Sequence, residues 1–280
     1  MILITGSSGF IASAFCKKLY DNNIYFGGYD LPNDIIDINK LDVRIPDMLI
    51  HFAAIANLND SIADQDKNFE VNIRGTYEVA KFCVKNNIPL IFISTCCVYH
   101  SNDMVDETIF PLTSEPYACS KMAGEYILRG MPGLRYVILR IGTVYGPGMR
   151  KELFNYIAFD KIMNDEIIKV NGDGSQTRTY VYIDDLIDGI YSACDKFKIL
   201  QGEIINLCGD EHISVNQTML TIKKIIGKDY MAEYGFERYG DFKRECVSIE
   251  KAENWLGWKP KTKYIDGMKR VYEWLKTLKK

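Results

Sequence analysis

Tyr117 and Lys121 stand four residues apart in the segment YACSK, a spacing that places two side chains on the same face of a helix. A lysine cation near a phenol lowers the pKa of the phenol and helps the phenolate to act as a base. Thr95 ends the apolar run LIFIST, and its hydroxyl could bind the same substrate oxygen as the phenol. Beside a nicotinamide ring, these three side chains would oxidise an alcohol, because the tyrosine takes the hydroxyl proton while hydride leaves for the cofactor.

The first thirty residues contain the elements that would hold such a cofactor. MILIT, GSSGFIA and the helical pattern SAFCKKLYDNN predict a strand, a tight turn and a helix in direct succession. Small residues in the turn let the backbone approach a pyrophosphate, whose negative charge faces the helix N-terminus. The candidate cofactor-binding residues of this turn are Gly6, Ser8, Gly9, Phe10 and Ile11.

Asp30 ends a second predicted strand, IYFGGYD, eighteen residues after Ala12. A carboxylate at this point can accept hydrogen bonds from a ribose diol and would repel a 2′-phosphate. The glycine spacing, GxxGxxA, is a weak signal by itself. Together with the strand, the helix and Asp30, it predicts a dinucleotide site that favours NAD over NADP.

The composition is that of an ordinary globular protein, since 47% of the 280 residues are hydrophobic and 25% are charged. The net charge of -3 makes neither nucleic acid nor an anionic membrane an obvious partner. Eight cysteines are scattered without CxxC pairs, which indicates neither a zinc site nor a disulfide framework. We therefore expect no metal and a cytoplasmic protein with reduced thiols, without a signal peptide or a membrane span.

Apolar runs alternate with helical patterns along the first half of the chain. This alternation predicts an α/β protein with a doubly wound parallel sheet of the Rossmann type. The predicted elements after the second strand are the strands IIDI, DMLIHFAAIAN, LIFIST and YVILRIGTVYGPG and helices over 60–87 and 117–129.

The rhythm of the sequence changes after Pro147. We expect an NAD-binding domain over 1–147, to which 180–205 crosses back. A smaller α/β substrate-binding cap should comprise 148–179 and 206–280. Ligands should bind between the two parts, beyond the carboxyl ends of the strands.

Motifs along nearly the whole chain resemble those of one family. They are GSSGFIA, HFAA, VNIRGT, ISTCCVY, YACSK, LRIGTVYGPG, NGDGSQTRTYVYIDD, INLCG and LGWKP. The chain resembles the extended short-chain dehydrogenase/reductases, and among them the NAD-dependent epimerase/dehydratase group that acts on nucleotide sugars. This resemblance implies that Thr95, Tyr117 and Lys121 are catalytic and that Lys121 also binds the nicotinamide ribose. It implies further cofactor contacts at Asp37, Ile38, Phe52, Ala53, Ala54 and Asn72.

The resemblance also indicates how a nucleotide sugar would be bound. Arg178 and Arg238 match the two arginines that grip the diphosphate in sugar-nucleotide epimerases, and a planar guanidinium meets phosphate oxygens in pairs. The candidate contacts to the sugar are Thr95, Cys96 and Thr143. Thr143 stands where the family often has a substrate-contacting asparagine. This is one departure from the family pattern, and the short connection between the second and third strands is another.

The residues after Thr95 separate the possible reactions. A 4,6-dehydratase of this family carries an Asp-Glu pair directly after the catalytic threonine, because elimination of water needs that acid and base. Cys96 and Cys97 occupy these positions here, which favours 4-epimerisation of a UDP- or other nucleotide-diphosphate hexose through a 4-keto intermediate. Cys97 lies where related 3,5-epimerases and epimerase-reductases place a catalytic cysteine. A 3,5-epimerase, dehydratase or reductase that uses Cys97 therefore remains the alternative.

Two further expectations concern the whole protein. A catalytically inactive NAD-binding sensor on the same fold is a second alternative, against which the intact catalytic residues argue. In related proteins the helices that correspond to 68–86 and 117–130 build a four-helix bundle between two subunits, so we expect a homodimer. His51, in the middle of a predicted strand, is interpreted as a packed core residue.

Overall fold

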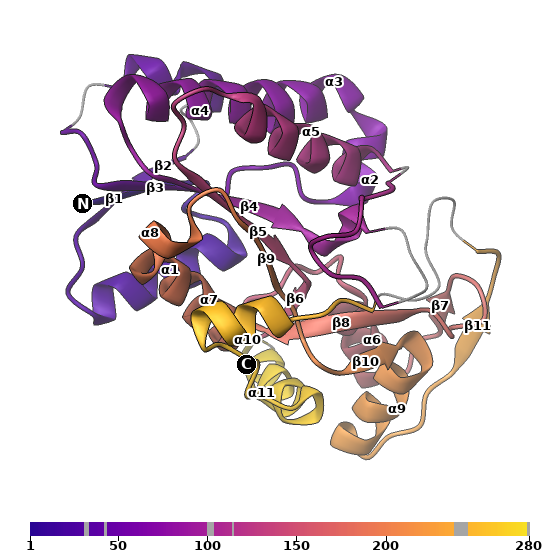
Figure 1. Ribbon diagram of the computed structural model, residues 1–280. Coiled ribbons are helices and arrows are strands. Elements are labelled where there is room, and N and C mark those ends of the chain that lie inside the picture. The colour runs from indigo at the N-terminus through magenta and orange to yellow at the C-terminus, as the bar shows by residue number, and fades with distance from the viewer. Residues whose placement is uncertain (31–33, 42–43, 100–103, 114, 238–245, 279–280) are drawn as a thin grey trace.

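The computed structural model of the chain describes residues 1–30, 34–41, 44–99, 104–113, 115–237 and 246–278. Its centre is a six-stranded sheet in which all neighbouring strands are parallel (Figure 1). Across this sheet the strands follow the order β2 (Phe26–Tyr29), β1 (Ile2–Thr5), β3 (Met48–His51), β4 (Leu90–Thr95), β5 (Tyr136–Ile141) and β9 (Ile204–Leu207). The order reverses between β1 and β3, which is the point where open α/β sheets bind ligands.

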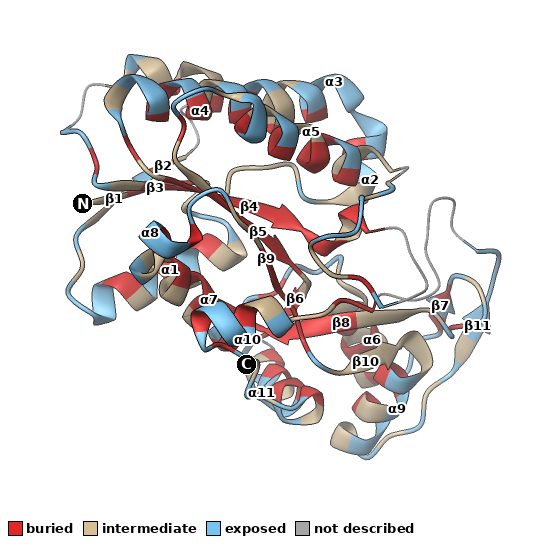
Figure 2. Ribbon diagram, in the orientation of Figure 1, coloured by how far each residue is buried: buried red, intermediate tan, exposed pale blue. Residues whose placement is uncertain are grey.

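Helices cover both faces of this sheet (Figure 1). One face carries α1 (Phe10–Asp21), α7 (Ile183–Asp195) and α8 (Phe197–Leu200). The other face carries the 3₁₀-helix η1 (Ile35–Lys40), α2 (Leu58–Ala63), α3 (Gln65–Asn68), the π-helix η2 (Phe69–Arg74), α4 (Gly75–Asn86) and α5 (Pro116–Gly130). β4 is buried along its whole length because helices pack against both of its sides (Figure 2). The predicted doubly wound α/β fold is therefore confirmed.

The C-terminal half adds two small sheets beside the ends of the central strands (Figure 1). One has the order β10 (His212–Ser214), β8 (Thr177–Tyr182) and β6 (Thr143–Tyr145), and the other pairs β11 (Ala232–Tyr234) with β7 (Ile168–Val170). The helices of this half are α6 (Phe154–Met163), α9 (Val215–Ile226), α10 (Glu250–Leu256) and α11 (Tyr264–Leu278). Its core contains Tyr145, Tyr180 and Tyr264, whose ring centroids lie 5.1 to 6.0 Å apart.

The predicted third strand, IIDI, is wrong, because these residues form the 3₁₀-helix η1. Asp34 caps this helix, and its side chain accepts a hydrogen bond from the Ile36 N–H group at 3.2 Å. Ile35 and Ile38 are the buried residues of the turn. Their spacing of three matches the period of a 3₁₀-helix, whereas a strand would alternate inward and outward side chains.

The predicted sixth strand is divided between two sheets. The Gly142 N–H group makes the last bond to the central sheet, to the Leu207 carbonyl at 3.0 Å. The next residue, Thr143, pairs with Tyr180 of β8. In the segment that was predicted to cross back, 180–205, the strand that joins the central sheet is β9. Strand β8 instead pairs with β6 and β10. The boundary between an NAD-binding domain and a cap stays a prediction.

All eight cysteines are free thiols. Among the described residues, no group of three or more His, Cys, Asp or Glu side chains is arranged to hold a metal ion. No helix in this part of the chain combines the length and the apolar character that crossing a membrane requires.

Candidate active site

The turn after β1 is narrow and carries small residues. Gly6 has a φ of +67°, and a Cβ atom there would lie 2.8 Å from the backbone of Ala53, so a side chain would not fit. Gly9 is the N-cap of α1 and provides no side-chain acceptor for the N–H groups of the first helical turn. The Ser8 N–H group donates to the Asp30 carboxylate at 2.6 Å, which ties the turn to the end of β2. A helix N-terminus of this kind fits a pyrophosphate.

The other candidate cofactor residues lie at different depths. Phe52 follows β3, and its N–H group donates to the Thr5 carbonyl at 3.3 Å, just before the glycine turn. The neighbouring candidates are half-buried and therefore accessible: Phe10, Ile11, Ala53 and Ala54. Asp37 is also half-buried, and its carboxylate pairs with Lys40 at 2.8 Å. The three-residue repeat of η1 turns the Ile38 side chain into the core, and a cofactor contact at Ile38 stays a prediction.

Helix α5 carries the predicted base and cation. Its N-cap is Glu115, whose carboxylate accepts the N–H groups of Tyr117 at 3.1 Å and of Ala118 at 2.9 Å. Pro116 occupies the first helical position, which its fixed φ angle favours. At Gly124 a Cβ atom would stand 2.8 Å from the Phe92 ring, so glycine lets the helix pack closely against β4. These features fix where α5 begins and how near it lies to the sheet.

The structure brings Tyr117 together with Thr95. The Thr95 hydroxyl interacts with the Tyr117 phenol and lowers its pKa, and it accepts the Cys97 N–H group at 3.2 Å. Burial raises the pKa of Tyr117 above its ordinary value, and a negative charge on Cys97 would raise it further. The Arg150 guanidinium opposes this effect and lowers the pKa of the phenol. Arg150 was not predicted, since no motif marks it in the sequence.

Lys121 is 3% exposed and lies one helical turn after Tyr117. Its ammonium group stands over the Phe92 ring, 4.6 Å from the centroid. Burial lowers the pKa of Lys121 to about 7, although the negative charge of Glu125 acts in the opposite direction. The amine therefore lies at the edge of being neutral near pH 7.

His51 belongs to a buried chain of hydrogen bonds, in agreement with its interpretation as a core residue. The Thr76 hydroxyl donates to the Asn72 carbonyl at 2.6 Å, so it must accept from His51 Nε2 at 3.1 Å. His51 Nδ1 consequently accepts from the Thr5 hydroxyl at 2.7 Å. Burial, followed by the charge of Lys121, lowers the pKa of His51 to about 3. The ring is neutral and links β1 with α4.

Asn72, predicted beside the cofactor, is 1% exposed and lies in the π-helix η2. Its amide oxygen accepts the Ile55 N–H group at 2.8 Å. Its amide nitrogen donates to the Ser120 hydroxyl at 2.9 Å, and that hydroxyl donates to the Tyr117 carbonyl at 2.7 Å. Asn72 thus connects the segment after β3 with the first turn of α5.

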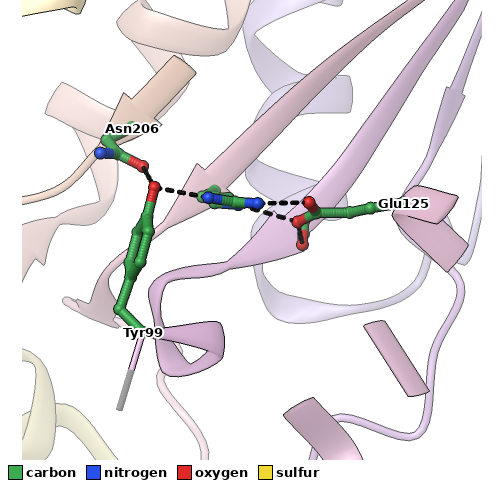
Figure 3. A network of polar contacts seen from close by, with 5 residues as sticks. Tyr99, Glu125 and Asn206 are labelled. Carbon is green, nitrogen blue, oxygen red and sulfur yellow. Dashed lines mark hydrogen bonds and ion pairs between the residues drawn. The ribbon is translucent and has the colours of Figure 1, made fainter. Parts of the chain in front are cut away.

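A buried ion pair joins α5 to β5 (Figure 3). Arg140 of β5 donates to both carboxylate oxygens of Glu125 on α5, at 3.0 and 2.6 Å. Arg140 also donates to the Tyr99 hydroxyl at 2.6 Å, which donates to Asn206 of β9 at 3.0 Å. The Ser94 hydroxyl donates to Glu125 at 2.5 Å. No sequence motif marks this network, although the charged residue inside the apolar run YVILRI is a signal that could have indicated it.

The predicted substrate contacts are less concentrated. Thr143 begins β6 and is half-buried, and Arg178 lies in β8, where its guanidinium donates to the Thr177 carbonyl at 2.8 Å. The Cys96 thiol is buried in the short turn after β4 and donates to the Arg140 carbonyl at 3.4 Å, and a sugar contact at Cys96 stays a prediction. Cys97, the next residue, is half-buried. Arg238 lies outside the described residues.

Residues 2–208 match the model of the NAD dependent epimerase/dehydratase family. The chain belongs to this family. A putative UDP-glucose 4-epimerase from Methanocaldococcus jannaschii is 31% identical, over 99% of this chain and 98% of its own length. The dTDP-glucose 4,6-dehydratase 1 of Escherichia coli is 25% identical, over 98% of this chain and 92% of its own length.

Among solved structures, this family member resembles the UDP-glucuronic acid 4-epimerase from Bacillus cereus in complex with UDP-glucuronic acid and NAD. The TM-score is 0.91, the sequence identity is 29%, and 99% of both chains is covered. The predicted family and the predicted Rossmann-type fold are confirmed. Because the relatives include epimerases and a dehydratase, the residues around Thr95 must separate the two reactions.

Proposed function

We propose that the protein is an NAD-dependent nucleotide-sugar epimerase that inverts carbon 4 of a UDP-hexose or another nucleotide-diphosphate hexose. The observation that carries this proposal is the juxtaposition of Tyr117 on α5 with Thr95 at the end of β4, with the buried Lys121 one helical turn away. The names of similar proteins support it, since they include a putative UDP-glucose 4-epimerase and a UDP-glucuronic acid 4-epimerase.

The turn after β1 fits NAD. Gly6 and Gly9 would border the pyrophosphate at the N-terminus of α1, and Asp30 would bind the ribose on the adenine side. Phe52 and Asp37 are proposed to line the remaining cofactor surface. When bound, NAD accepts a hydride from carbon 4 of the sugar and returns it to the opposite face.

Three side chains of this chain would handle the proton. Thr95 orients the 4-hydroxyl group of the sugar by a hydrogen bond. Tyr117 accepts the hydroxyl proton as a phenolate and returns it after the 4-keto sugar has turned over. Lys121 favours the phenolate through its positive charge. No second acid–base pair is needed for this reaction.

The alternative reactions need groups that the site provides less well. A 4,6-dehydratase would need an acid and a base after Thr95, where Cys96 is buried and Cys97 is a thiol. One observation favours a thiol reaction as the second candidate, because Cys97 is half-buried and acts electrostatically on Tyr117. A 3,5-epimerase or reductase would use this thiol to exchange protons beside a 4-keto group.

The substrate contacts belong to the proposal as well. Arg178 and Arg238 would bind the diphosphate, and Thr143 would contact the sugar from β6. These residues come from the predicted cap over 148–179 and 206–280 and from its border with the NAD-binding domain. The proposal also places the protein in the cytoplasm, because all eight cysteines are free thiols.

A substrate panel in deuterated water tests the reaction. The protein with NAD is incubated with UDP-, dTDP-, GDP- and CDP-hexoses and with a UDP-hexuronate, and the products are followed by NMR. We expect inversion at carbon 4 without uptake of deuterium. Deuterium at carbon 3 or 5 would instead identify the thiol reaction.

Two variants separate the roles of the tyrosine and the thiol. Tyr117→Phe keeps the ring and removes the base, so activity should fall about a hundred- to ten-thousand-fold. Cys97→Ala should keep most of the activity, and Cys119→Ala, which removes an exposed thiol from α5, is its control. Full activity in Tyr117→Phe would contradict the mechanism. Collapse in Cys97→Ala alone would favour the thiol reaction.

We also propose a homodimer that is formed through α4 and α5. Tyr77, Val84 and Tyr126 are exposed on these helices, at 44%, 37% and 45%. They border a shallow hollow of about 650 Å³ that contains none of the candidate catalytic residues. An exposed apolar face of this kind is typical of an interaction surface.

A further inference from the structure

The Glu125–Arg140 pair is the most deeply buried ion pair among the described residues, with side chains that are 0% and 1% exposed. Such a pair contributes little to stability compared with apolar residues of the same size. Its place in the fold is therefore informative. Glu125 lies one helical turn after Lys121 on α5, and Ser94, which donates to Glu125, directly precedes Thr95 on β4.

We propose that Glu125, fixed by Arg140, is a positioning residue that keeps the Lys121 ammonium group charged beside Tyr117. This inference rests on the proposed function, in which the lysine charge favours the tyrosine phenolate. It adds a role for two residues that touch neither substrate nor cofactor.

Burial and the charge of Glu125 act in opposite directions on the protonation of Lys121. Burial disfavours the ammonium form, and the Phe92 ring offers only a weak attraction to the cation. Among the described residues, Lys121 Nζ forms no hydrogen bond or ion pair that would offset this burial. Glu125 is the charged group that favours the ammonium form. At a helical spacing of four residues, the Cβ atoms of Lys121 and Glu125 lie about 5–6 Å apart.

The other ionisable groups near Lys121 are uncharged, act on Tyr117 or are exposed. His51 of β3 faces the lysine as an uncharged ring. Cys97 of η3 (Cys96–Val98) and Arg150 act on Tyr117. Four helices pack against α5: α2, α3, η2 and α4. Their charged side chains, and that of Asp64 between α2 and α3, are exposed or half-exposed. These residues are Asp60, Asp64, Asp66, Lys67, Glu70, Arg74, Glu78, Lys81 and Lys85.

The buried hydrogen bonds from Arg140 and Ser94 hold the Glu125 carboxylate in one position. Arg140 meets both carboxylate oxygens, and its own position is fixed by Tyr99 and by the backbone of β5. Tyr99 donates in turn to Asn206 (Figure 3), and the Asn206 amide nitrogen donates to the Ser248 carbonyl at 3.2 Å. The carboxylate therefore cannot change its position without breaking several buried hydrogen bonds.

The test is a direct titration of Lys121 in the whole protein without substrate. Lysine side chains are labelled with ¹³C at the ε position and followed by NMR from pH 5 to 11. The Lys121 signal is identified by its loss in Lys121→Met. We expect a midpoint near 7 in the unmodified protein, clearly below that of an exposed lysine. This midpoint is the reference against which the variants at Glu125 and Arg140 are compared.

Opposite variants distinguish an electrostatic role from a structural one. Glu125→Gln should lower the Lys121 midpoint by about one pH unit. Arg140→Gln leaves the carboxylate uncompensated and should raise the midpoint. Ser94→Ala keeps both charges and should leave it unchanged. A purely structural role predicts no opposite shifts, so equal midpoints in the two charge variants would overturn the proposal.

A double variant protects the test against unfolding. Glu125→Gln/Arg140→Met removes both charges, so neither is left buried and unpaired. Its Lys121 midpoint should also fall, because Glu125 acts on the lysine. An unchanged midpoint in a folded double variant would contradict the proposal.

The pH profile of epimerisation gives the second measurement. The alkaline limb, where Lys121 loses its proton, should move to lower pH in the double variant by the same amount as the midpoint. A midpoint shift without any epimerase activity in the unmodified protein would refute the proposed reaction and leave the role of Glu125 standing.

Discussion

At the scale of single residues, Lys121 combines a charge with an environment that disfavours charge. The folded protein holds this amine with a pKa of about 7, whereas an unfolded chain restores the ordinary value of 10.5. Between these values the unfolded state binds more protons than the folded state, so stability rises with pH across the window. Below pH 7 the full cost of burying the ammonium group is present.

Lys121→Met should therefore stabilise the fold while it abolishes activity. We expect a gain of roughly 2–4 kcal/mol in the free energy of unfolding at pH 6, which shrinks toward zero at pH 10.5. Urea unfolding at several pH values measures this difference. Lys224→Met, at an exposed position on α9, is the matched control and should show no such pH dependence. A Lys121→Met protein that is less stable than the unmodified one at pH 6 would refute the argument.

The sequence indicated some of these residues and concealed others for a physical reason. Tyr117 and Lys121 share a helix face, and Thr95 ends an apolar strand, so their proximity follows from local periodicity. Glu125 and Arg140 belong to a helix and a strand that pack together only in three dimensions. No local rule predicts which buried carboxylate meets which buried guanidinium.

At the scale of elements, the π-helix η2 aligns two separate segments. It places Asn72 between the backbone of Ile55 and the side chain of Ser120. π-helical turns are rare in proteins, and those that occur often lie at functional sites. Here the turn connects the strand end that borders the glycine turn with the helix that carries Tyr117.

Asn72→Ala should cost roughly 1–3 kcal/mol of stability, because it removes the acceptor of the Ile55 N–H group and a donor to the buried Ser120 hydroxyl. Ser120→Ala removes fewer contacts and should cost less. The double variant should cost less than the sum of the two, because the residues share one hydrogen bond. Urea unfolding of the four proteins gives the coupling free energy. Strict additivity would show that the Asn72–Ser120 contact contributes nothing.

The sequence predicted an element correctly where a long apolar run dominates the segment. It was less informative where capping or the pairing partner of a strand decides the structure. β4 is buried along its whole length and was predicted as LIFIST. The segment IIDI is as apolar as a short strand, but the Asp34 cap and the spacing of Ile35 and Ile38 select a 3₁₀-helix. The apolar pattern of β6 and β8 shows that they are strands and does not specify which sheet they join.

At the scale of the whole molecule, the exposed face of α4 and α5 gives the assembly prediction. Val84→Glu/Tyr126→Glu should convert a dimer into monomers, since charges would enter the apolar centre of the interface. Light scattering at micromolar concentration measures the mass. Ile199→Glu, at a position on α8 that is 68% exposed, is the control and should leave the dimer intact. An unmodified protein that is already monomeric would exclude this interface.

The position of β9 at the edge of the central sheet has a consequence for synthesis on the ribosome. β5 ends at Ile141 and β9 begins at Ile204, so at about 5–20 residues per second β5 waits on the order of 3–12 s for its neighbour. During that interval the apolar strand YVILRI presents an open edge, which is prone to pair with other chains. Limited proteolysis of ribosome-bound chains of increasing length should find β5 cleavable until β9 has emerged, and protection in a shorter chain would contradict this. A growing chain of this protein is therefore most exposed to aggregation while the stretch between these two strands is being made.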